Sequence, residues 1–291
     1  MPKVKSSPLS RYPNPIRAAL KMSEIPLGKS TQYISVYTPE LLFPILRSEK
    51  RDELDNRFLD FKGKDIWNAF EISWLNPKGL PKIAIGVFEF DAGTPKIIES
   101  KSFKLYLNSF NQSRFSSLAE VQSIMAKDLS AACGGEVSVE LIEPANFNRN
   151  AISQLEGEVI DDIDIEIAEY AYNPSLLANS TSDEHTSEVL VSHLLKSNCL
   201  ITSQPDWASI QIRYTGSKID RAKLLAYLIS FRSHNEFHEQ CVERIFADIK
   251  SLCAPEKLTV YARYTRRGGL DINPWRSDFE LDIENVRLAR Q

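Results

Sequence analysis

The chain has 291 residues, of which 43% are hydrophobic, so it can build a sizeable core without covalent cross-links. Its 35 basic and 39 acidic residues leave a net charge of -4, which gives no general attraction to nucleic acids or acidic membranes. The sequence contains neither the apolar stretch of roughly 18 residues that a membrane span requires nor the apolar run of an export signal. We therefore expect a cytoplasmic protein with no membrane partner.

Four cysteines, Cys133, Cys199, Cys241 and Cys253, are spread along the chain without a close pair. This spacing predicts neither a disulfide framework nor a zinc ribbon. Reduced thiols are the expected state of all four.

The first predicted elements lie in the N-terminal half. Residues 1–30 contain several prolines and serines without a clear period, and they predict an arm on the surface. From Trp67 to Asp91, two segments rich in β-branched and aromatic residues predict a hairpin whose turn is Asn-Pro-Lys-Gly. A helical pattern then runs from Lys101 to Leu129 and is broken near Asn111.

The middle of the chain is acidic and then polar. In the latter part of Val159–Ile167, acidic residues alternate with isoleucines. This alternation predicts a strand with a solvated acidic face and an isoleucine face, rather than a metal site. The polar residues 173–188 mark a boundary between two modules, which we place at 31–175 and 176–291.

The second half of the chain echoes the first. The sequence LYLNSF at 105–110 returns as AYLISF at 226–231, and at the same spacing VSV at 137–139 returns as LTV at 258–260. Two matches with one spacing predict a duplicated module.

The predicted elements of the second half agree with this duplication. A strand covers residues 209–214, and Asp220 is the expected N-cap of a helix over 221–232. A second helix over 235–253 and a strand over 257–263 follow. Each half thus has strands, two helices and strands again, and the absence of βαβ alternation predicts antiparallel pairing.

Cys199 is a candidate nucleophile. An ordinary thiol has a pKa of about 8.5 and is only a few per cent ionised at neutral pH, so a working nucleophile needs a neighbour that handles its proton. Asp206 follows closely, behind the rigid Pro205, and could have this role. The alternative is that Cys199 simply fills a gap in the core.

Two other polar clusters are candidates for a site. His238 and Glu239 lie where the second helix of the C-terminal half is expected to begin, so the helix dipole would favour an ionised Glu239 and a neutral His238. The alternative is an ordinary polar helix start. In the same way, the Glu-Ser-Lys-Ser sequence at 99–102 could be a plain helix cap.

Arg266 and Arg267 precede two glycines. Guanidinium groups and a closely approaching backbone suit a phosphate. The chain has neither a Gly-x-Gly-x-x-Gly motif nor a P-loop motif, so a nucleotide would have to bind in another way.

Three motifs together resemble the NADPH-dependent 7-cyano-7-deazaguanine reductases of queuosine biosynthesis, a tRNA modification pathway, in their long two-module form. The motifs are ESKSFKLYLNSF at 99–110, the Cys199 segment that ends in QPDW, and FHE at 237–239. The resemblance implies an α+β fold of two tandem tunnelling-fold modules, each an antiparallel sheet backed by two helices, with the nucleophile in the second. It also implies a homodimer, because such sheets close into barrels by association.

The resemblance further implies the chemistry, in which no metal takes part. Cys199 would add to the nitrile carbon of 7-cyano-7-deazaguanine and form a thioimide, and Asp206 would give a proton to the nitrogen. NADPH would then reduce the adduct in two steps to the aminomethyl product, with His238 handling the later protons. The implied substrate-binding residues are Ile98, Glu99, Ser100, Phe237, His238 and Glu239. The implied cofactor-binding residues are Ser100, Lys101, Arg267 and Gly268.

Two other functions stay open from the residues alone. A cysteine hydrolase would use Cys199 in the same way, but water would resolve the adduct. A base- or RNA-binding module would use Arg266, Arg267 and aromatic residues, although the acidic net charge makes direct nucleic-acid binding unexpected.

Overall fold

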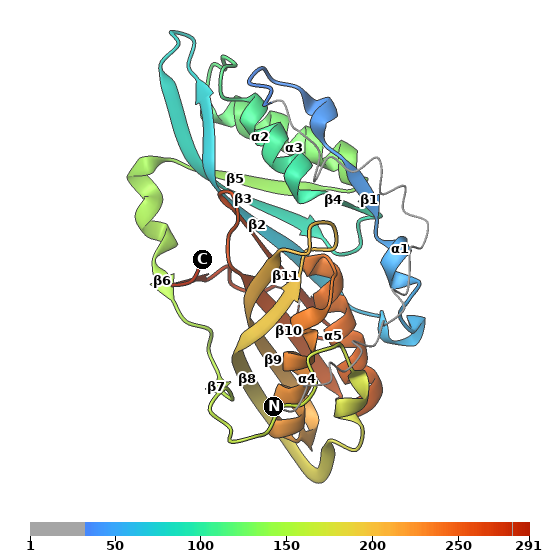
Figure 1. Cartoon of the computed structure of the whole chain (residues 1–291). Coiled ribbons are helices and arrows are strands. Elements are labelled where there is room, and N and C mark those ends of the chain that lie inside the picture. The colour runs from blue at the N-terminus through green and yellow to red at the C-terminus, as the bar shows by residue number, and fades with distance from the viewer. Residues whose placement is uncertain (1–32, 281) are drawn as a thin grey trace, which may run out of the picture.

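A single eight-stranded sheet runs through the chain and joins its two halves (Figure 1). The computed structural model describes residues 33–280 and 282–291. The strand order is β5-β3-β2-β11-β10-β9-β8-β7, and all neighbours are antiparallel except β7 and β8. The strands are β2 (Lys62–Leu75), β3 (Pro81–Asp91), β5 (Val137–Ile142), β7 (Glu158–Val159), β8 (Thr181–Asn198), β9 (Pro205–Ile219), β10 (Lys257–Tyr264) and β11 (Leu270–Ser277).

The hairpin and the helical pattern predicted for the N-terminal half are confirmed, whereas the arm predicted over 1–30 lies outside the described residues. Strands β2 and β3 form the expected hairpin, and Gly79 turns it with a φ of 86°. The broken helical pattern is two helices, α2 (Ser100–Ser109) and α3 (Leu118–Cys133). Helix α3 begins at the N-cap Ser117 and ends where Gly134 takes a left-handed conformation with a φ of 81°.

The C-terminal half repeats this arrangement. Strands β8 and β9 form a hairpin, and α4 (Arg221–Ser230) is capped by Asp220, as predicted. Helix α5 (His238–Cys253) follows, and the strand predicted over 257–263 is β10. In both halves a tyrosine of the first helix donates to an aspartate of the second: Tyr106 to Asp128 at 2.7 Å, and Tyr227 to Asp248 at 2.6 Å.

Short elements complete the chain. Strand β1 (Pro44–Leu46) pairs with β4 (Lys96–Ile98), and β6 (Ile152–Ser153) pairs with β12 (Arg287–Leu288). The remaining short helices are η1 (Pro39–Leu41), α1 (Ser48–Arg51), η2 (Asn56–Phe58), η3 (Pro144–Asn150), η4 (Pro174–Leu177) and η5 (Phe231–Ser233). In the described part of the chain, no helix has the length and apolar character needed to cross a membrane.

The acidic segment after β7 differs from the prediction. Only Glu158 and Val159 form a strand, and residues 160–167 have no regular pairing. The Asp161 carboxylate instead accepts hydrogen bonds from Ser192 Oγ (2.6 Å) and the backbone of His193 (2.8 Å), where β8 bulges. Side chains therefore hold this segment against β8. Ile163 and Ile165 still pack against the hydrophobic core of the second half, while Asp162, Asp164 and Glu166 stay exposed.

Helices α2 to α5 lie on one side of the sheet, with a hydrophobic core beneath each helix pair (Figure 1). In the first core, Phe103 packs edge-on against Trp67 and Phe88 with ring centroids 5.1 Å apart in each pair. The opposite side of the sheet is covered by the C-terminal segment, where Leu288 joins a small third cluster with Trp275.

The pairing of β11 with β2 positions the functional site. Their register runs without a break from Leu270 opposite Ala69 to Ser277 opposite Lys62. This pairing makes one sheet of the two halves. It also brings the start of α2 from the first half close to the start of α5 from the second. Residues from both helix starts line one cavity.

Candidate functional site

One cavity gathers most of the residues that the sequence predicts for a site. The predicted residues that line it are Ile98, Ser100, Cys199, Asp206, Phe237, His238, Glu239 and Arg267. They come from both halves of the chain, from the end of β4 and start of α2 to the turn between β10 and β11. The other predicted residues, Glu99, Lys101 and Gly268, are not among its lining residues.

Cys199 begins the loop between β8 and β9. Its backbone N–H donates to the Gln204 carbonyl at 2.8 Å, and its own carbonyl accepts from Ser203 N–H at 3.0 Å. Ser203 takes a left-handed conformation with a φ of 56° to close this turn. The Cys199 residue is 7% exposed and lines the cavity together with charged groups, which is not the surrounding of a residue that only fills an apolar core.

Asp206 lies near the start of β9 between Arg267 and His238. One carboxylate oxygen is 2.7 Å from Arg267 Nη2, and the other is 3.2 Å from His238 Nε2. Arg267 also donates from Nη1 to Gln204 Oε1 at 2.7 Å. The turn between β10 and β11 therefore holds both Asp206 and the loop that carries Cys199.

His238 is the first residue of α5 and is fixed by stacking. Its ring lies parallel to that of Tyr264 on β10, with centroids 3.8 Å apart and an angle of 4° between the planes. Its Nδ1 atom is buried and lacks a hydrogen-bond partner among the described residues. The ring thus presents one nitrogen to Asp206 and leaves the other available.

Glu239 is the second residue of α5, and only 3% of it is exposed. Burial, and after it the negative charge of Asp65, raises the pKa of this carboxyl group to about 7. The expectation that the helix start would favour the ionised form is therefore wrong, because desolvation outweighs the helix dipole here. Near neutral pH the group can exchange a proton.

Glu99 is the N-cap of α2, as the helix-cap interpretation of residues 99–102 predicted. Its two carboxylate oxygens accept hydrogen bonds from the backbone N–H groups of Lys101 (2.9 Å) and Ser102 (2.7 Å). Burial raises the pKa of Glu99, and these two hydrogen bonds oppose that shift. Its role toward a substrate stays a prediction.

Sequence reasoning missed Lys104, which lies one turn into α2 from Ser100. Its pKa is lowered, first by burial and then by the nearby charge of Arg267. Gly268 has a φ of 57°, and a Cβ atom placed there would lie 3.6 Å from Lys104 Nζ. The spacing of four residues that puts Ser100 and Lys104 on one helix face was the signal available in the sequence.

Glu236 was missed as well. It lines the cavity and accepts hydrogen bonds from Arg244 Nη2 (2.7 Å) and His234 Nε2 (2.9 Å). Despite burial, these partners lower its pKa to about 2. Glu236 is thus a fixed anion, in contrast to the neighbouring Glu239.

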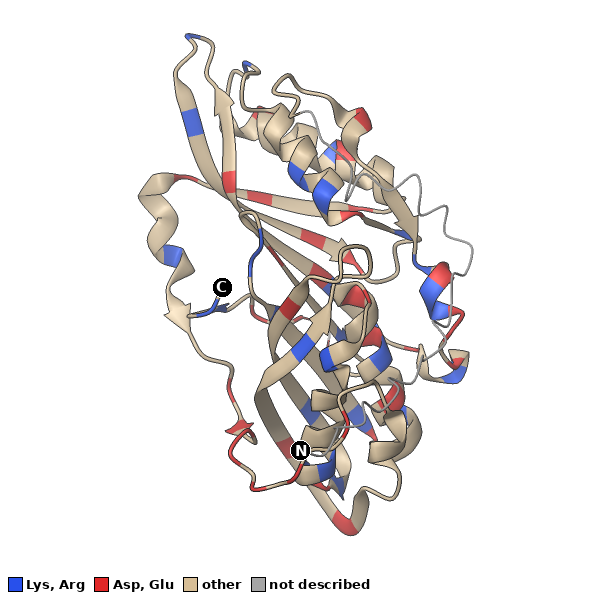
Figure 2. Ribbon diagram, in the orientation of Figure 1, with Lys and Arg blue, Asp and Glu red and all other residues tan. Residues whose placement is uncertain are grey.

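Arg266 lies away from the cavity. Its guanidinium group stands 4.9 Å from the centre of the Phe70 ring. Figure 2 also shows basic and acidic residues interspersed along both halves. Neither observation favours the RNA-binding alternative.

Comparisons with known proteins match both halves. A family model described as "Nitrile reductase, 7-cyano-7-deazaguanine-reductase N-term" matches residues 33–141, and one described as "QueF-like protein" matches residues 205–282. A curated protein of Chromobacterium violaceum, named NADPH-dependent 7-cyano-7-deazaguanine reductase, is 58% identical over 269 residues. That alignment covers 91% of this chain and 96% of the relative.

The buried carboxyl group of Glu239 predicts a pH-dependent stability. In the unfolded chain it ionises near 4.5 and in the folded chain near 7, so between these values the folded state binds more protons and loses stability as the pH rises. Glu239→Gln lacks this group, so its free energy of unfolding should not fall in this way. Between pH 5 and pH 8 we expect the difference in unfolding free energy between the variant and the unsubstituted chain to shift by roughly 2 kcal/mol in favour of the variant. Thermal unfolding of both proteins at pH 5 and pH 8 measures this shift. A stability difference between the two proteins that is equal at both pH values would contradict the prediction.

Proposed function

We propose that this chain, which belongs to the 7-cyano-7-deazaguanine nitrile reductase family, uses NADPH to reduce the nitrile of that base to a primary amine in queuosine biosynthesis. The observation that carries the proposal is the single cavity in which a thiol, a carboxylate, an imidazole and a buried carboxyl group meet. A thiol that adds to a nitrile needs a proton acceptor beside it and a proton donor for the nitrogen. Cys199, Asp206 and His238 provide these groups.

The first step is addition of Cys199 to the nitrile. The sulfur forms a bond to the nitrile carbon, one carbon–nitrogen π bond breaks, and the nitrogen takes up a proton to give a thioimide. The Asp206 carboxylate, oriented by Arg267 at 2.7 Å, would accept the thiol proton and pass it to the nitrogen. The net change is addition of S–H across the triple bond.

His238 serves the later proton transfers. Stacking on Tyr264 and contact with Asp206 fix the orientation of its ring. As carbon–sulfur cleavage returns the thiolate and the nitrogen gains further protons, an imidazole in contact with Asp206 can supply them and be reprotonated from solvent.

The base would be bound at the start of α5. The guanine-like edge carries N–H donors that suit a carboxylate, and Glu239 offers one at the cavity wall. Glu99 already accepts two backbone hydrogen bonds but retains lone pairs for a further donor. Phe237 and Ile98 would flank the ring.

The residues present fit NADPH at the turn between β10 and β11. Lys104 and Arg267 are close enough that the charge of Arg267 lowers the pKa of Lys104, and a phosphate would balance this pair. Gly268 keeps the backbone open beside them, and Ser100 and Lys101 belong to the same turn of α2 as Glu99. When bound, NADPH supplies hydride to the carbon of the former nitrile.

The reaction is tested by following NADPH absorbance with the nitrile base present. Because a nitrile needs four electrons to become an amine, we expect about two NADPH consumed for each amine formed. Without NADPH, intact mass should increase by the mass of the base in the unsubstituted protein and stay unchanged in Cys199→Ala.

The controls separate this reaction from the alternatives. Cys253→Ala alters a thiol hydrogen-bonded to Ser180 outside the cavity, and it should still form the adduct. An acid or amide product without NADPH loss would indicate the cysteine hydrolase instead. An adduct of the same mass in Cys199→Ala would refute the nucleophile assignment.

Arg267→Ala should weaken the binding of NADPH more than the binding of the base. Loss of a charged hydrogen-bond donor costs about 1.5–3 kcal/mol, so we expect the KM for NADPH to rise by roughly tenfold or more. The matched control is Arg266→Ala, because that side chain lies over Phe70 instead of lining the cavity. Equal increases in both KM values of Arg267→Ala would contradict the cofactor role.

We also propose the finer architecture and assembly. The modules would be tunnelling-fold units over 31–175 and 176–291, after an N-terminal arm over 1–30 that lies outside the described residues. Strand β5 stands at one end of the sheet, and the short β7 covers little of β8 at the other. Open edges favour association of two copies. Sedimentation equilibrium should give the mass of a homodimer, and a monomer at micromolar concentration would contradict this.

A further inference from the structure

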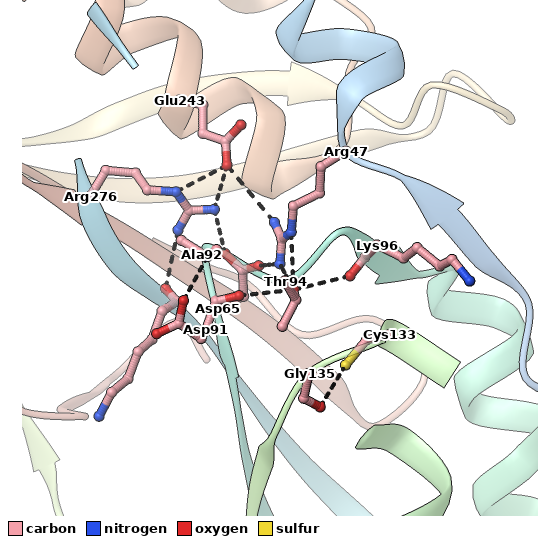
Figure 3. A network of polar contacts seen from close by, with 12 residues as sticks. Arg47, Asp65, Asp91, Ala92, Thr94, Lys96, Cys133, Gly135, Glu243 and Arg276 are labelled. Carbon is pink, nitrogen blue, oxygen red and sulfur yellow. Dashed lines mark hydrogen bonds and ion pairs between the residues drawn. The ribbon is translucent and has the colours of Figure 1, made fainter. Parts of the chain in front are cut away.

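A buried ionic network joins the two halves of the chain (Figure 3). Its members are Arg47, which follows β1, Asp65 of β2, Glu243 of α5 and Arg276 of β11. None of the four is more than 3% exposed. Arg51 of α1, also in the first half and less buried, donates to both oxygens of Glu243 at 2.9 and 2.7 Å.

The contacts of the network are close and shared. Asp65 accepts from Arg47 Nη2 at 2.5 Å and from Arg276 Nη2 at 2.8 Å. Glu243 Oε1 accepts from Arg276 Nε (3.0 Å) and Nη2 (2.8 Å), so Arg276 bridges the two carboxylates. Arg47 Nη1 lies 3.8 Å from the same Glu243 oxygen and has no hydrogen-bond partner among the described residues.

The network lies one helical turn from Glu239. Residues four apart on a helix share a face, so Glu243 and Glu239 both lie on the side of α5 that meets the first half. The two network residues from the first half act on Glu239 with opposite signs: Asp65 raises its pKa and Arg47 lowers it. A buried network is weak evidence for stability alone, because apolar replacements are often as stable.

We propose that Asp65, Arg47, Arg276 and Glu243 form a positioning unit that holds the start of α5 against the first half and sets the pH range in which Glu239 can bind the base. The inference rests on the proposed function. Asp65 and Arg47 act through Glu239 and do not contact the base.

The unit couples proton release to base binding. Glu239 can accept hydrogen bonds from the base on both oxygens only when it is ionised. Its pKa is about 7, so below that pH binding must release a proton and becomes weaker. The other charged or titratable groups around it are His238 on its own helix and Cys199, Asp206, Glu236 and Arg267 around the cavity.

The test measures the dissociation constant of 7-cyano-7-deazaguanine by calorimetry between pH 5.5 and 8.5. Full-length Cys199→Ala serves as the parent protein because it cannot form the covalent adduct. We expect affinity to fall with decreasing pH, with a midpoint near 7. Adding Asp65→Asn should move the midpoint to lower pH by about one unit, and adding Arg47→Met should move it to higher pH by a similar amount.

Shifts of the midpoint in opposite directions for Asp65→Asn and Arg47→Met distinguish this role from a purely structural one. Arg47→Lys keeps the charge and should return the midpoint toward that of the parent. Asp128→Asn, which alters a carboxylate held by Tyr37 and Tyr106, should leave the midpoint unchanged. If Asp65→Asn fails to fold, the comparison of Arg47→Met with Arg47→Lys still tests whether charge at this position sets the midpoint.

Midpoints that stay fixed, or that move in the same direction for Asp65→Asn and Arg47→Met, would overturn the proposal and leave the proposed reaction intact. A parent protein that binds no base at any pH would overturn both. Loss of affinity without a shift of the midpoint would mean that the network only supports the fold.

Discussion

The pairing of β11 with β2 is the contact on which the site depends. Neither half alone contains the cavity, since Ser100 belongs to the first half and Cys199 and His238 to the second. The backbone ladder brings these elements to one place over the full length of β11. The buried charges of Asp65 and Arg276 lie across the same joint, so the ladder and the ionic contacts fix the position of α5 together.

Inside this site, desolvation and pairing divide the carboxyl groups into different roles. Glu236 has the cationic Arg244 within hydrogen-bond distance and serves as a fixed anion, whereas Asp206 lies between Arg267 and His238. Glu239 has no such partner close by among the described residues and is buried to a similar degree, so its proton is held near neutral pH. Two neighbouring carboxyl groups thus differ in kind: Glu236 is a permanent charge, and Glu239 can exchange a proton near neutral pH.

Local patterns in the sequence predicted the elements and much of the site. Asp220 and Gly79 mark a helix start and a hairpin turn through their own chemistry, and the echo of LYLNSF predicted the second helix pair. The helix spacing could place Lys104 beside Ser100, but the closeness of Lys104 to Arg267 and of Asp65 to Arg276 could not be predicted, because these neighbours come from the other half. The segment after Val159 was misjudged because alternating burial arises there from side-chain contacts without a ladder.

The repeated architecture explains why the functional groups are distributed so unevenly. Cys199 lies in the β8–β9 connection, whose counterpart in the first half is the exposed turn that ends at Gly79. Conversely, Ser100 at the start of α2 lines the cavity, whereas the corresponding start of α4 at Arg221 does not. Each half therefore provides a part of the site that its counterpart lacks. Because the two parts are complementary, separating the halves would leave Cys199 without the α2 side of its cavity, even if each helix pair kept its own core.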